Sequence, residues 1–119
     1  MLASKNRLKK KIDFARIEID GVMYQSRSFG MGIYNRKDEE SSHFGFIIST
    51  KISKKAVIRN KIKRIISEAI RKRLGSIKKG LDVIYLIKPF AVKIDKIELE
   101  REVDEIITKN LQINSLPNS

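Results

Sequence analysis

The 119-residue sequence contains no cysteine, no tryptophan and a single histidine, His43. The lack of cysteine excludes disulfides, thiolate nucleophiles and zinc–thiolate sites, and it is typical of a reducing compartment. With one histidine, the chain also has little to offer a nuclease site built on histidine acid and base chemistry. We interpret His43 as a surface residue at the start of a strand.

Long apolar stretches are also missing. No run of about 18 apolar residues is present, and the charged start MLASKNRLKKK lacks the hydrophobic region of a signal peptide. We therefore expect a cytoplasmic protein without a membrane partner.

Carboxylates are not grouped in the way that a metal-dependent nuclease requires. Six acids lie within 95–108, scattered around an expected helix without an Asp-x-Asp pattern or a histidine partner, so we interpret them as a solvated face. Gly30 and Gly32 lack the strand-to-helix context of a dinucleotide-binding loop. We expect a protein that binds, with no catalytic side chains and no metal or cofactor held by the protein alone.

Positive charge is what the sequence has in excess: the net charge is +12 and the pI is near 10.1. Such a field attracts polyanions, of which nucleic acid and anionic membrane are the two candidates. With 41% hydrophobic and 34% charged residues, the chain is apolar enough to form one compact domain over 1–119.

The first half of the chain is expected to form one helix and two or three strands. Apolar residues at helical spacing predict a helix over 6–19, which Gly21 is expected to end. Residues 22–36 mix aromatic, polar and glycine residues and indicate a short hairpin arm and then a strand through Tyr34. The stretch HFGFIIST at 43–50 is typical of a strand. We expect it to pair antiparallel with the strand before it.

The second half is expected to alternate helix, strand and helix. Ser53 is predicted to cap a basic helix over 53–73, because its hydroxyl can accept a hydrogen bond from the first turn. LDVIYLIK at 81–88 predicts a strand that is buried on both faces. Asp95, with Glu98 three residues later, predicts the start of the last helix.

Together these elements predict an α+β fold, a two-layer sandwich of three helices and a small mixed sheet in the order α-β-β-β-α-β-α. The strands on either side of the basic helix are candidates for parallel neighbours. The chain is expected to form a single domain whose last residues, 113–119, are a frayed tail.

Charge is concentrated on the basic helix and its flanks, since residues 51–79 carry twelve Lys or Arg and one acid, a net charge of +11. At ~100° per residue, the apolar side of the helix is formed by Ile58, Ile62, Ile65, Ile66, Ala69 and, at its edge, Ile70. The opposite side carries Asn60, Lys63, Arg64, Ser67 and Arg71, with Arg59 on the flank. Clustered cations repel one another, and Lys54 and Lys55 oppose the helix dipole, so the arrangement is favourable only beside an anion such as phosphate.

We therefore predict nucleic-acid binding, with a merely solvated basic face as the alternative. Membrane binding is disfavoured because the apolar side carries branched isoleucine rather than interfacial Trp or Phe. The candidate RNA-binding residues are Lys51, Lys54, Lys55, Arg59, Asn60, Lys61, Lys63, Arg64 and Arg71. Phe14 follows a second basic cluster near the N-terminus and is the aromatic residue most readily placed in a cleft.

Three motifs in this sequence resemble those of one family, the protein subunit of bacterial ribonuclease P. In KKAVIRNKIKRIISEAIR, the matching residues are Arg59, Asn60, Ile62, Lys63 and Arg64, while Lys61 stands where the family usually has arginine. KNRLKKKIDF resembles the opening of the family's sequences, and GLDVIYLIKP is similar to their last strand. The resemblance covers nearly the whole chain in order.

This resemblance implies that the protein assists a catalytic RNA, the RNA subunit of a ribonucleoprotein endoribonuclease that removes 5′ leaders from precursor tRNA. The expected partners are that RNA and the precursor tRNA, with no protein partner required, and Mg2+ is expected in the RNA-containing holoenzyme. The basic helix would dock on the RNA subunit. A cleft between the first helix and the sheet would hold the leader, with Phe14, Arg7, Lys10 and Tyr34. The family fold also implies a left-handed β-α-β crossover.

Four departures from the family pattern bear on binding. Glu18 stands where an aromatic residue is frequent, and Gly32 stands where the strand is expected to carry another. Ser67 replaces a usual arginine, and Ser53 replaces a common glycine. We expect RNA binding to survive these changes and leader selectivity to be the property that they alter.

Two other interpretations stay open. The chain is alternatively a non-catalytic RNA-binding or ribosome-associated accessory protein, because ribosomal domains share the fold that the resemblance implies. A DNA-binding helix protein is the other alternative. It is disfavoured because a strand, and not a helix with a short glycine turn, precedes the basic helix.

Overall fold

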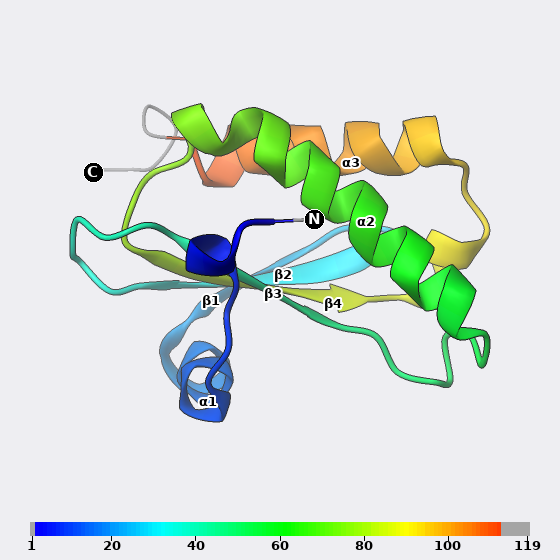
Figure 1. The fold of residues 1–119 in the computed structure, drawn as a ribbon, viewed down its shortest axis with the longest axis horizontal. Helices are drawn as coiled ribbons and strands as arrows, with labels where there is room; N and C mark the ends of the chain where they lie inside the picture. Colours follow the sequence, from blue (N-terminus) through cyan, green and yellow to red (C-terminus); the bar gives the residue numbers. More distant parts are fainter. Residues whose placement is uncertain (1, 113–119) are drawn as a thin grey trace.

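The computed structural model of the protein describes residues 2–112, so the predicted tail at 113–119 lies outside the described residues. Its elements are α1 (Lys11–Asp20), β1 (Val22–Gln25), β2 (Phe29–Asn35), β3 (His43–Ile47), α2 (Ala56–Arg73), β4 (Leu81–Ile87) and α3 (Lys96–Asn110). Short 3-10 turns lie at Ser4–Asn6, Leu74–Ser76 and Pro89–Val92. The predicted α+β fold and its element order are confirmed. Helices α2 and α3 form a layer on one face of the sheet, and α1 lies against the other (Figure 1).

The four strands form one mixed sheet in the order β1-β2-β4-β3. β2 pairs with β4 antiparallel, and β3 pairs with β4 parallel, so the expected parallel neighbours are confirmed. The predicted antiparallel pairing of the strands in 22–36 and 43–50 is wrong, because β4 lies between them. β4 is buried at every residue except half-buried Leu86, and such a strand gains most from the centre of a sheet. The left-handed sense of the crossover from β3 through α2 to β4 stays a prediction.

The loop between β2 and β3 is fastened to the chain that enters β4. The N–H of Arg36 donates to the carbonyl of Gly80 at 2.8 Å, and the N–H of Gly80 donates to the carbonyl of Glu40 at 2.8 Å. Gly80 has φ of +82°, and a Cβ atom there would collide with the backbone of Asp38. Only glycine fits this position without strain, so Gly80 lets the loop between β2 and β3 pack closely against the chain that enters β4.

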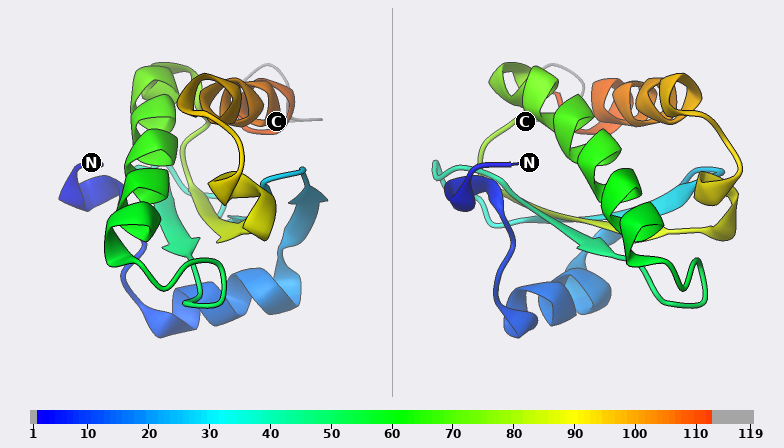
Figure 2. Two further views of the ribbon diagram at one scale, coloured as in Figure 1. Left: turned by 90° about the vertical axis from the view of Figure 1, so that its right-hand side faces the viewer. Right: turned by 45° about the vertical axis from the view of Figure 1, so that its right-hand side comes forward.

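The face of the sheet under α2 and α3 carries the main hydrophobic core. Figure 2 shows the two helices side by side above the strands. From α2 the core receives Ile62, Ile65, Ile66, Ala69 and Ile70, as predicted, with Ile58 partly buried beside them. From α3 it receives Leu99, Val103, Ile106 and Ile107, whereas Ile97 on the same helix is 68% exposed.

The opposite face carries a much smaller cluster of three buried residues, Leu8, Ile17 and Ile84. Two glycines allow α1 to approach the strands closely. A Cβ on Gly45 would lie 2.8 Å from Cζ of Phe14, and one on Gly32 would lie 2.8 Å from Cγ2 of Ile17. The closeness of α1 to the sheet is therefore set by the absence of side chains at 32 and 45.

The first helix is shorter than predicted. It begins at Lys11 and not at residue 6, because Leu8 lies in an extended segment whose N–H donates to the carbonyl of Phe44 at 2.9 Å. Gly21 follows the last helical residue, as predicted. The apolar spacing exaggerated the buried side of this helix, since Ile12 and Ile19 are 70% and 78% exposed.

The two predicted caps have different outcomes. Asp95 accepts a hydrogen bond from the N–H of Glu98 at 3.0 Å and caps α3, as predicted. Ser53 does not cap α2, which begins at Ala56; its hydroxyl instead accepts from the N–H of Lys55 at 3.2 Å, within the preceding loop.

Candidate nucleic-acid interface

The basic side of α2 faces solvent along one side of the molecule. Of the predicted RNA-binding residues, those that are exposed are Lys51, Lys54, Lys55, Asn60, Lys61, Arg64 and Arg71. Arg59 and Lys63 are half-buried. All nine lie on α2 or on the loop that leads into it, so a single element and its entry present the whole set.

The N-terminus of α2 is open. Its N-cap residue, Lys55, makes no side-chain capping bond, and no acidic residue lies in the first turn. The first N–H groups of a helix need an acceptor from outside the helix and, with the helix dipole, form a natural site for an anion. The positions of Lys54 and Lys55 beside these groups are therefore suited to a phosphate.

Two of the predicted RNA-binding arginines of α2 already have partners in the chain. Arg59 donates from Nη1 to the carbonyl of Ser53 at 2.8 Å, which ties the entry loop to the helix. Arg71 donates to Glu68 at 3.0 and 2.8 Å. This hydrogen bond raises the pKa of Arg71 and lowers the pKa of Glu68. Because Glu68 offsets part of its charge, Arg71 is less available to a polyanion than Arg64.

The helical wheel predicted that Ser67 lies on the solvent side of α2. The structure shows that it does not. It is 1% exposed, and its hydroxyl has no hydrogen-bond partner among residues 2–112. Together with Lys63 it lines a cavity of about 210 Å³ that also contacts the N-terminal segment at Leu2. That segment covers this flank of α2, which sequence periodicity cannot reveal.

This cavity, called the β3-edge cavity below, is lined by Leu2, Arg7, Leu8, Phe14, Phe44, Gly45, Phe46, Lys63 and Ser67. It brings together two of the four predicted cleft residues, Arg7 and Phe14, and adds Lys63 from the basic helix. Sequence reasoning did not place Phe46 or Ser67 here. The pairing of the N-terminal segment with β3, which assembles the cavity, is a long-range contact without a local sequence signal.

The other two predicted cleft residues lie apart from this cavity. Lys10 is exposed immediately before α1. Tyr34 packs with Phe14 against the small cluster on the α1 face, but its ring is covered by the guanidinium of Arg16, 5.0 Å from the ring centroid. Arg16 also forms an ion pair with Asp13. A base could stack on this face of Tyr34 only after displacing Arg16.

The departures at 18 and 32 differ in their structural setting. Glu18 is exposed on α1. Gly32 is buried, and a Cβ there would lie 2.8 Å from side-chain atoms of both Ile17 and Met23. An aromatic side chain at 32 therefore does not fit the present packing of α1.

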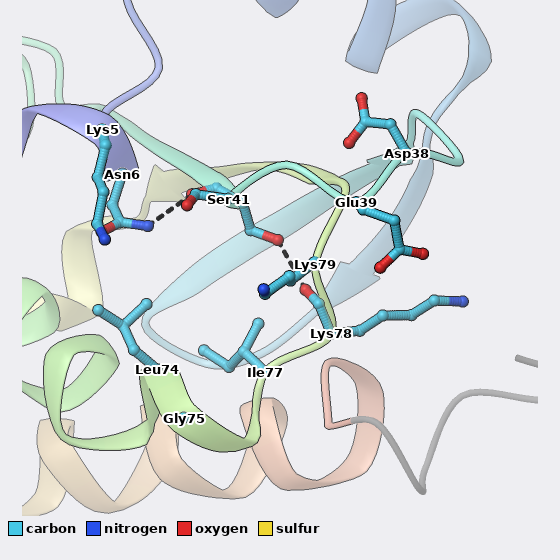
Figure 3. Close-up of a pocket in the computed structure, with 11 residues that line it drawn as sticks. Lys5, Asn6, Asp38, Glu39, Ser41, Leu74, Gly75, Ile77, Lys78 and Lys79 are labelled. Carbon is cyan, nitrogen blue, oxygen red and sulfur yellow. Dashed lines mark hydrogen bonds between the residues drawn. The ribbon is translucent and has the colours of Figure 1, made fainter.

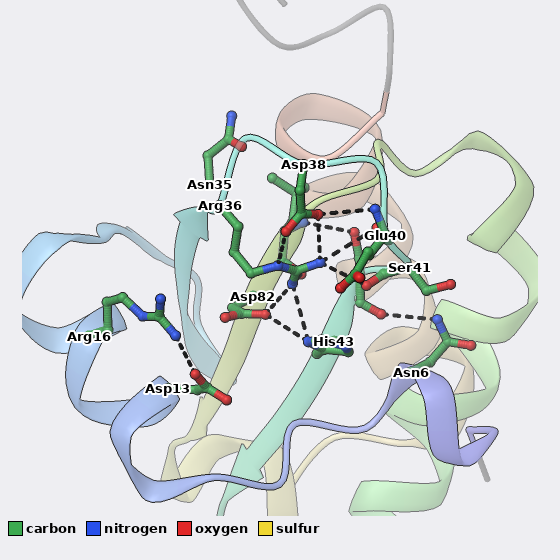
Figure 4. Close-up of polar contacts among 12 residues, drawn as sticks. Asn6, Asp13, Arg16, Asn35, Arg36, Asp38, Glu40, Ser41, His43 and Asp82 are labelled. Atoms are coloured by element: carbon green, nitrogen blue, oxygen red, sulfur yellow. Dashed lines mark hydrogen bonds and ion pairs between the residues drawn. The ribbon is translucent and has the colours of Figure 1, made fainter.

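A buried ionic cluster, not predicted from the sequence, lies at the end of the sheet where β3 begins (Figure 4). Asp82 is 1% exposed and pairs with Arg36 and, at 2.9 Å, with Nδ1 of His43. Burial lowers the pKa of Arg36, but its hydrogen bonds to Asp38 and Asp82 outweigh this and raise the pKa above its ordinary value. The interpretation of His43 as a simple surface residue is thus corrected: it is half-buried within this cluster.

A larger cavity, of about 570 Å³, lies at the far end of α2 (Figure 3). Its lining contains Lys5, Lys78 and Lys79 but also Asp38 and Glu39. The amide of Asn6 donates to the carbonyl of Ser42 at 3.0 Å and closes one side. Because both charge signs line it, this cavity is a weaker candidate for nucleic acid than α2.

Helix α3 carries an acidic side chain, Glu102, that is held by several hydrogen bonds. Glu102 accepts hydrogen bonds from the N–H and hydroxyl of Ser28 at 2.8 and 2.7 Å and from the hydroxyl of Ser26, so it fastens α3 to the turn between β1 and β2.

Across residues 2–112, no three His, Asp or Glu side chains gather in a way that could hold a metal ion. No helix in the described part of the chain is long and apolar enough to span a membrane.

Fold and surface together define a class of small α+β domain that presents one basic helix, with an open N-terminus, beside a cavity lined by aromatic and cationic residues. The sequence profile of the ribonuclease P family matches residues 2–111. The chain therefore belongs to the family of ribonuclease P protein components, which form part of an RNA–protein endoribonuclease.

Similar proteins agree with this assignment. The chain is 30% identical to the ribonuclease P protein component of a Pseudanabaena species over 109 residues, covering 92% of this chain and 94% of that protein. It is 40% identical to the corresponding protein of Dictyoglomus turgidum over 83 residues, 70% of this chain and 68% of that one. The solved structure of the Staphylococcus aureus RNase P protein is similar with a TM-score of 0.80 and 28% identity, covering 86% and 92% of the two chains.

Proposed function

We propose that this chain binds the catalytic RNA of ribonuclease P through the basic side of α2 and binds the single-stranded leader of precursor tRNA beside the β3-edge cavity. The observation that carries the proposal is the open, uncapped N-terminus of α2 flanked by Lys54 and Lys55. It provides N–H donors and cations for phosphate, on the helix whose remaining cations also face solvent.

The arrangement supports a division of tasks between protein and RNA. The protein places cations and hydrogen-bond donors against phosphates, which lowers the repulsion between two RNA chains. Mg2+ held in the RNA-containing holoenzyme would supply the hydrolytic chemistry. The protein would work in the cytoplasm, where its RNA partners are made, and it would need no second protein.

Leader binding is proposed for Phe14 and Arg7, which line the β3-edge cavity. Tyr34 and Lys10 would act at its periphery. An aromatic ring and a cation in one recess are the elements that single-stranded RNA requires, for base stacking and for backbone charge. Arg16 would compete with a base for the ring of Tyr34.

The proposal is tested by cleavage of a precursor tRNA with a bacterial ribonuclease P RNA at low magnesium, with and without the protein. Stimulation of cleavage by the protein is the expected result. Tight binding of the RNA without stimulation would instead favour an RNA-binding accessory protein, and failure of both would overturn the proposed function.

A further inference from the structure

The outer side of α1 carries an apolar stripe, formed by Ile12, Ala15 and Ile19, that no part of the described chain covers. At ~100° per residue, these three residues fall within a sector of ~60° that lies ~160° from Ile17, which α1 buries against the sheet. Ile19 and Ile12 are 78% and 70% exposed, more than any other large apolar side chain within residues 2–112. Exposed apolar residues that are set in a row, rather than scattered singly, indicate an interaction surface.

The apolar surface continues beyond the end of α1 onto β1. Val22 and Met23 are 57% and 39% exposed, and β1 is the first strand in the sheet order, so its outer edge has no neighbouring strand. Figure 2 shows α1 along the lower border of the molecule, with the sheet on one side of it and no helix or strand on the other. The stripe is therefore open to a second molecule.

The charges of α1 are arranged against its own helix dipole, which favours acids at the start of a helix and cations at its end. Lys10 and Lys11 stand at the start, whereas Glu18 and Asp20 stand at the end, where the last turn has no basic residue. The one acid of the first turn, Asp13, is already paired within the helix. Across residues 2–112, neither lysine and neither of the two terminal acids forms an ion pair. This arrangement is unfavourable in a lone helix and becomes favourable beside a helix that runs in the opposite direction.

A second copy of α1 supplies such a helix. In an antiparallel pair, Ile12 of each copy packs against the partner's Ile19, and the small Ala15 lets the two helices approach closely at the centre. Lys11 then lies beside the partner's Glu18, an attractive contact that occurs twice. In a parallel pair, Lys11 would instead lie beside the partner's Arg16 and be repelled. Since the same surface is used by both copies, the contact closes with two-fold symmetry.

The charge of α1 permits this contact in a strongly basic protein. Residues 11–20 carry two cations and three acids, a net charge of −1, against +12 for the whole chain. Most of the positive charge is on α2 and its flanks, and α2 lies on the opposite face of the sheet (Figure 1). At physiological salt, exposed charges that are farther apart than ~8 Å are largely screened from one another. Pairing through α1 therefore leaves both basic helices free to bind RNA.

We propose that the outer side of α1 is a self-association surface, through which two copies of this chain form an antiparallel, two-fold symmetric dimer. At ~1.5 Å per residue, α1 is only ~15 Å long. The contact is thus smaller than the ~800 Å² per partner of a standard interface, and the dimer is weak and reversible. This inference does not depend on the proposed function, because none of the residues that we assign to RNA belongs to the stripe.

The first test is sedimentation equilibrium of the full chain, freed of nucleic acid, over a wide range of protein concentration. Ile19→Ser is compared with the control Ile97→Ser, which replaces an isoleucine that is 68% exposed on α3. We expect Ile19→Ser to raise the dissociation constant of the dimer at least ~tenfold, because each dimer loses two buried isoleucines, and the control to change it less than ~twofold. A chain that stays monomeric at every concentration would overturn the proposal, as would equal effects of the two substitutions.

The antiparallel arrangement is tested by charge reversal. Lys11→Glu and Glu18→Lys each set like charges beside one another in a dimer of identical copies, so each should weaken self-association by about threefold or more. When the two variants are mixed in equal amounts, every lysine can face an acid again, and association should return to that of the wild type. A mixture that associates no better than either variant alone would overturn the antiparallel dimer.

Discussion

The two faces of the sheet are built in different ways. The face under α2 and α3 is apolar from end to end and is sealed by two helices. The face under α1 has three buried apolar residues in its middle and an ionic cluster around Asp82 at one end. The first face supplies most of the buried apolar area and hence most of the stability. The second face, called the α1 face below, buries few apolar residues, and the cavity proposed for the leader opens beside it.

The largest expected effect is the loss of stability when Asp82 is removed from the α1 face. Asp82→Ala leaves Arg36, whose side chain is 11% exposed, without its buried counter-charge, and breaking such a pair costs ~3–5 kcal/mol. The free energy of unfolding in urea measures this loss. Asp38→Ala is the matched control, because it removes the other carboxylate of Arg36, which is 38% exposed, and should cost less than ~1 kcal/mol. Similar losses in both variants would contradict the view that Arg36 depends on Asp82 as its buried counter-charge.

The next effect compares one isoleucine from each face. Ile66 and Ile17 are both 0% exposed, and substitution of such a residue by alanine costs ~2–5 kcal/mol, more where the structure cannot collapse into the cavity. Ile66 is enclosed by two helices and the sheet, whereas Ile17 lies on the lone helix α1. We expect Ile66→Ala to lie near the upper end of that range and Ile17→Ala near the lower end in the same unfolding measurement. The reverse order would contradict the view that the α1 face is the softer one.

A smaller effect separates the outer sides of the two helices that cover the main core. Arg64→Ala on α2 should weaken affinity for a ribonuclease P RNA by ~1–3 kcal/mol and reduce the dependence of affinity on salt. Arg101→Ala removes an arginine that is also exposed, from α3 and among acidic neighbours, and should change affinity by less than ~0.5 kcal/mol. Both variants are assayed by titration at several salt concentrations. Equal losses would mean that the whole charge of the protein, and not α2, attracts the RNA.

The smallest effect concerns a hydroxyl in the main core. Tyr85 is fully buried between Phe29 and Phe46, burial raises the pKa of its hydroxyl, and the hydroxyl has no partner within residues 2–112. Tyr85→Phe removes a polar group that is not hydrogen-bonded, so the free energy of unfolding should stay the same or rise by up to ~1 kcal/mol. A clear loss of stability would indicate that the hydroxyl has a partner in solution.

Local pattern in the sequence predicted the parts of the fold that local physics determines. The apolar side of α2, the cap at Asp95 and the burial of β4 all follow from spacing or residue type over a few positions. The predicted pairing of β2 with β3 was wrong because it assumed that neighbours in sequence pair in space. Gly80, forty-five residues after the end of β2, fastens the loop that makes room for β4, and no local signal marks that contact.

The candidate site was predicted in the same uneven way. The cations of α2 were identified from charge and period alone, and the structure exposes most of them. Ser67 was placed on the wrong side because a helical wheel does not include the N-terminal segment, which covers one flank of α2. The cavity, and the role of the β3 edge in it, depend on chain segments that are brought together only by folding.

The central position of β4 also has a consequence for the order in which the chain is made. On the ribosome, β2 and β3 are complete well before residues 81–87 emerge. Until then β2 can pair with β1 alone, and β3 lacks β4, the strand beside it in the finished sheet. The basic helix is synthesised in that interval. The nascent chain thus exposes its most cationic segment before β4, which joins β2 to β3, has been made. Such long-range pairing is slow to form and prone to wrong associations. The four-stranded sheet on which the basic helix packs is therefore complete only once β4 has been made.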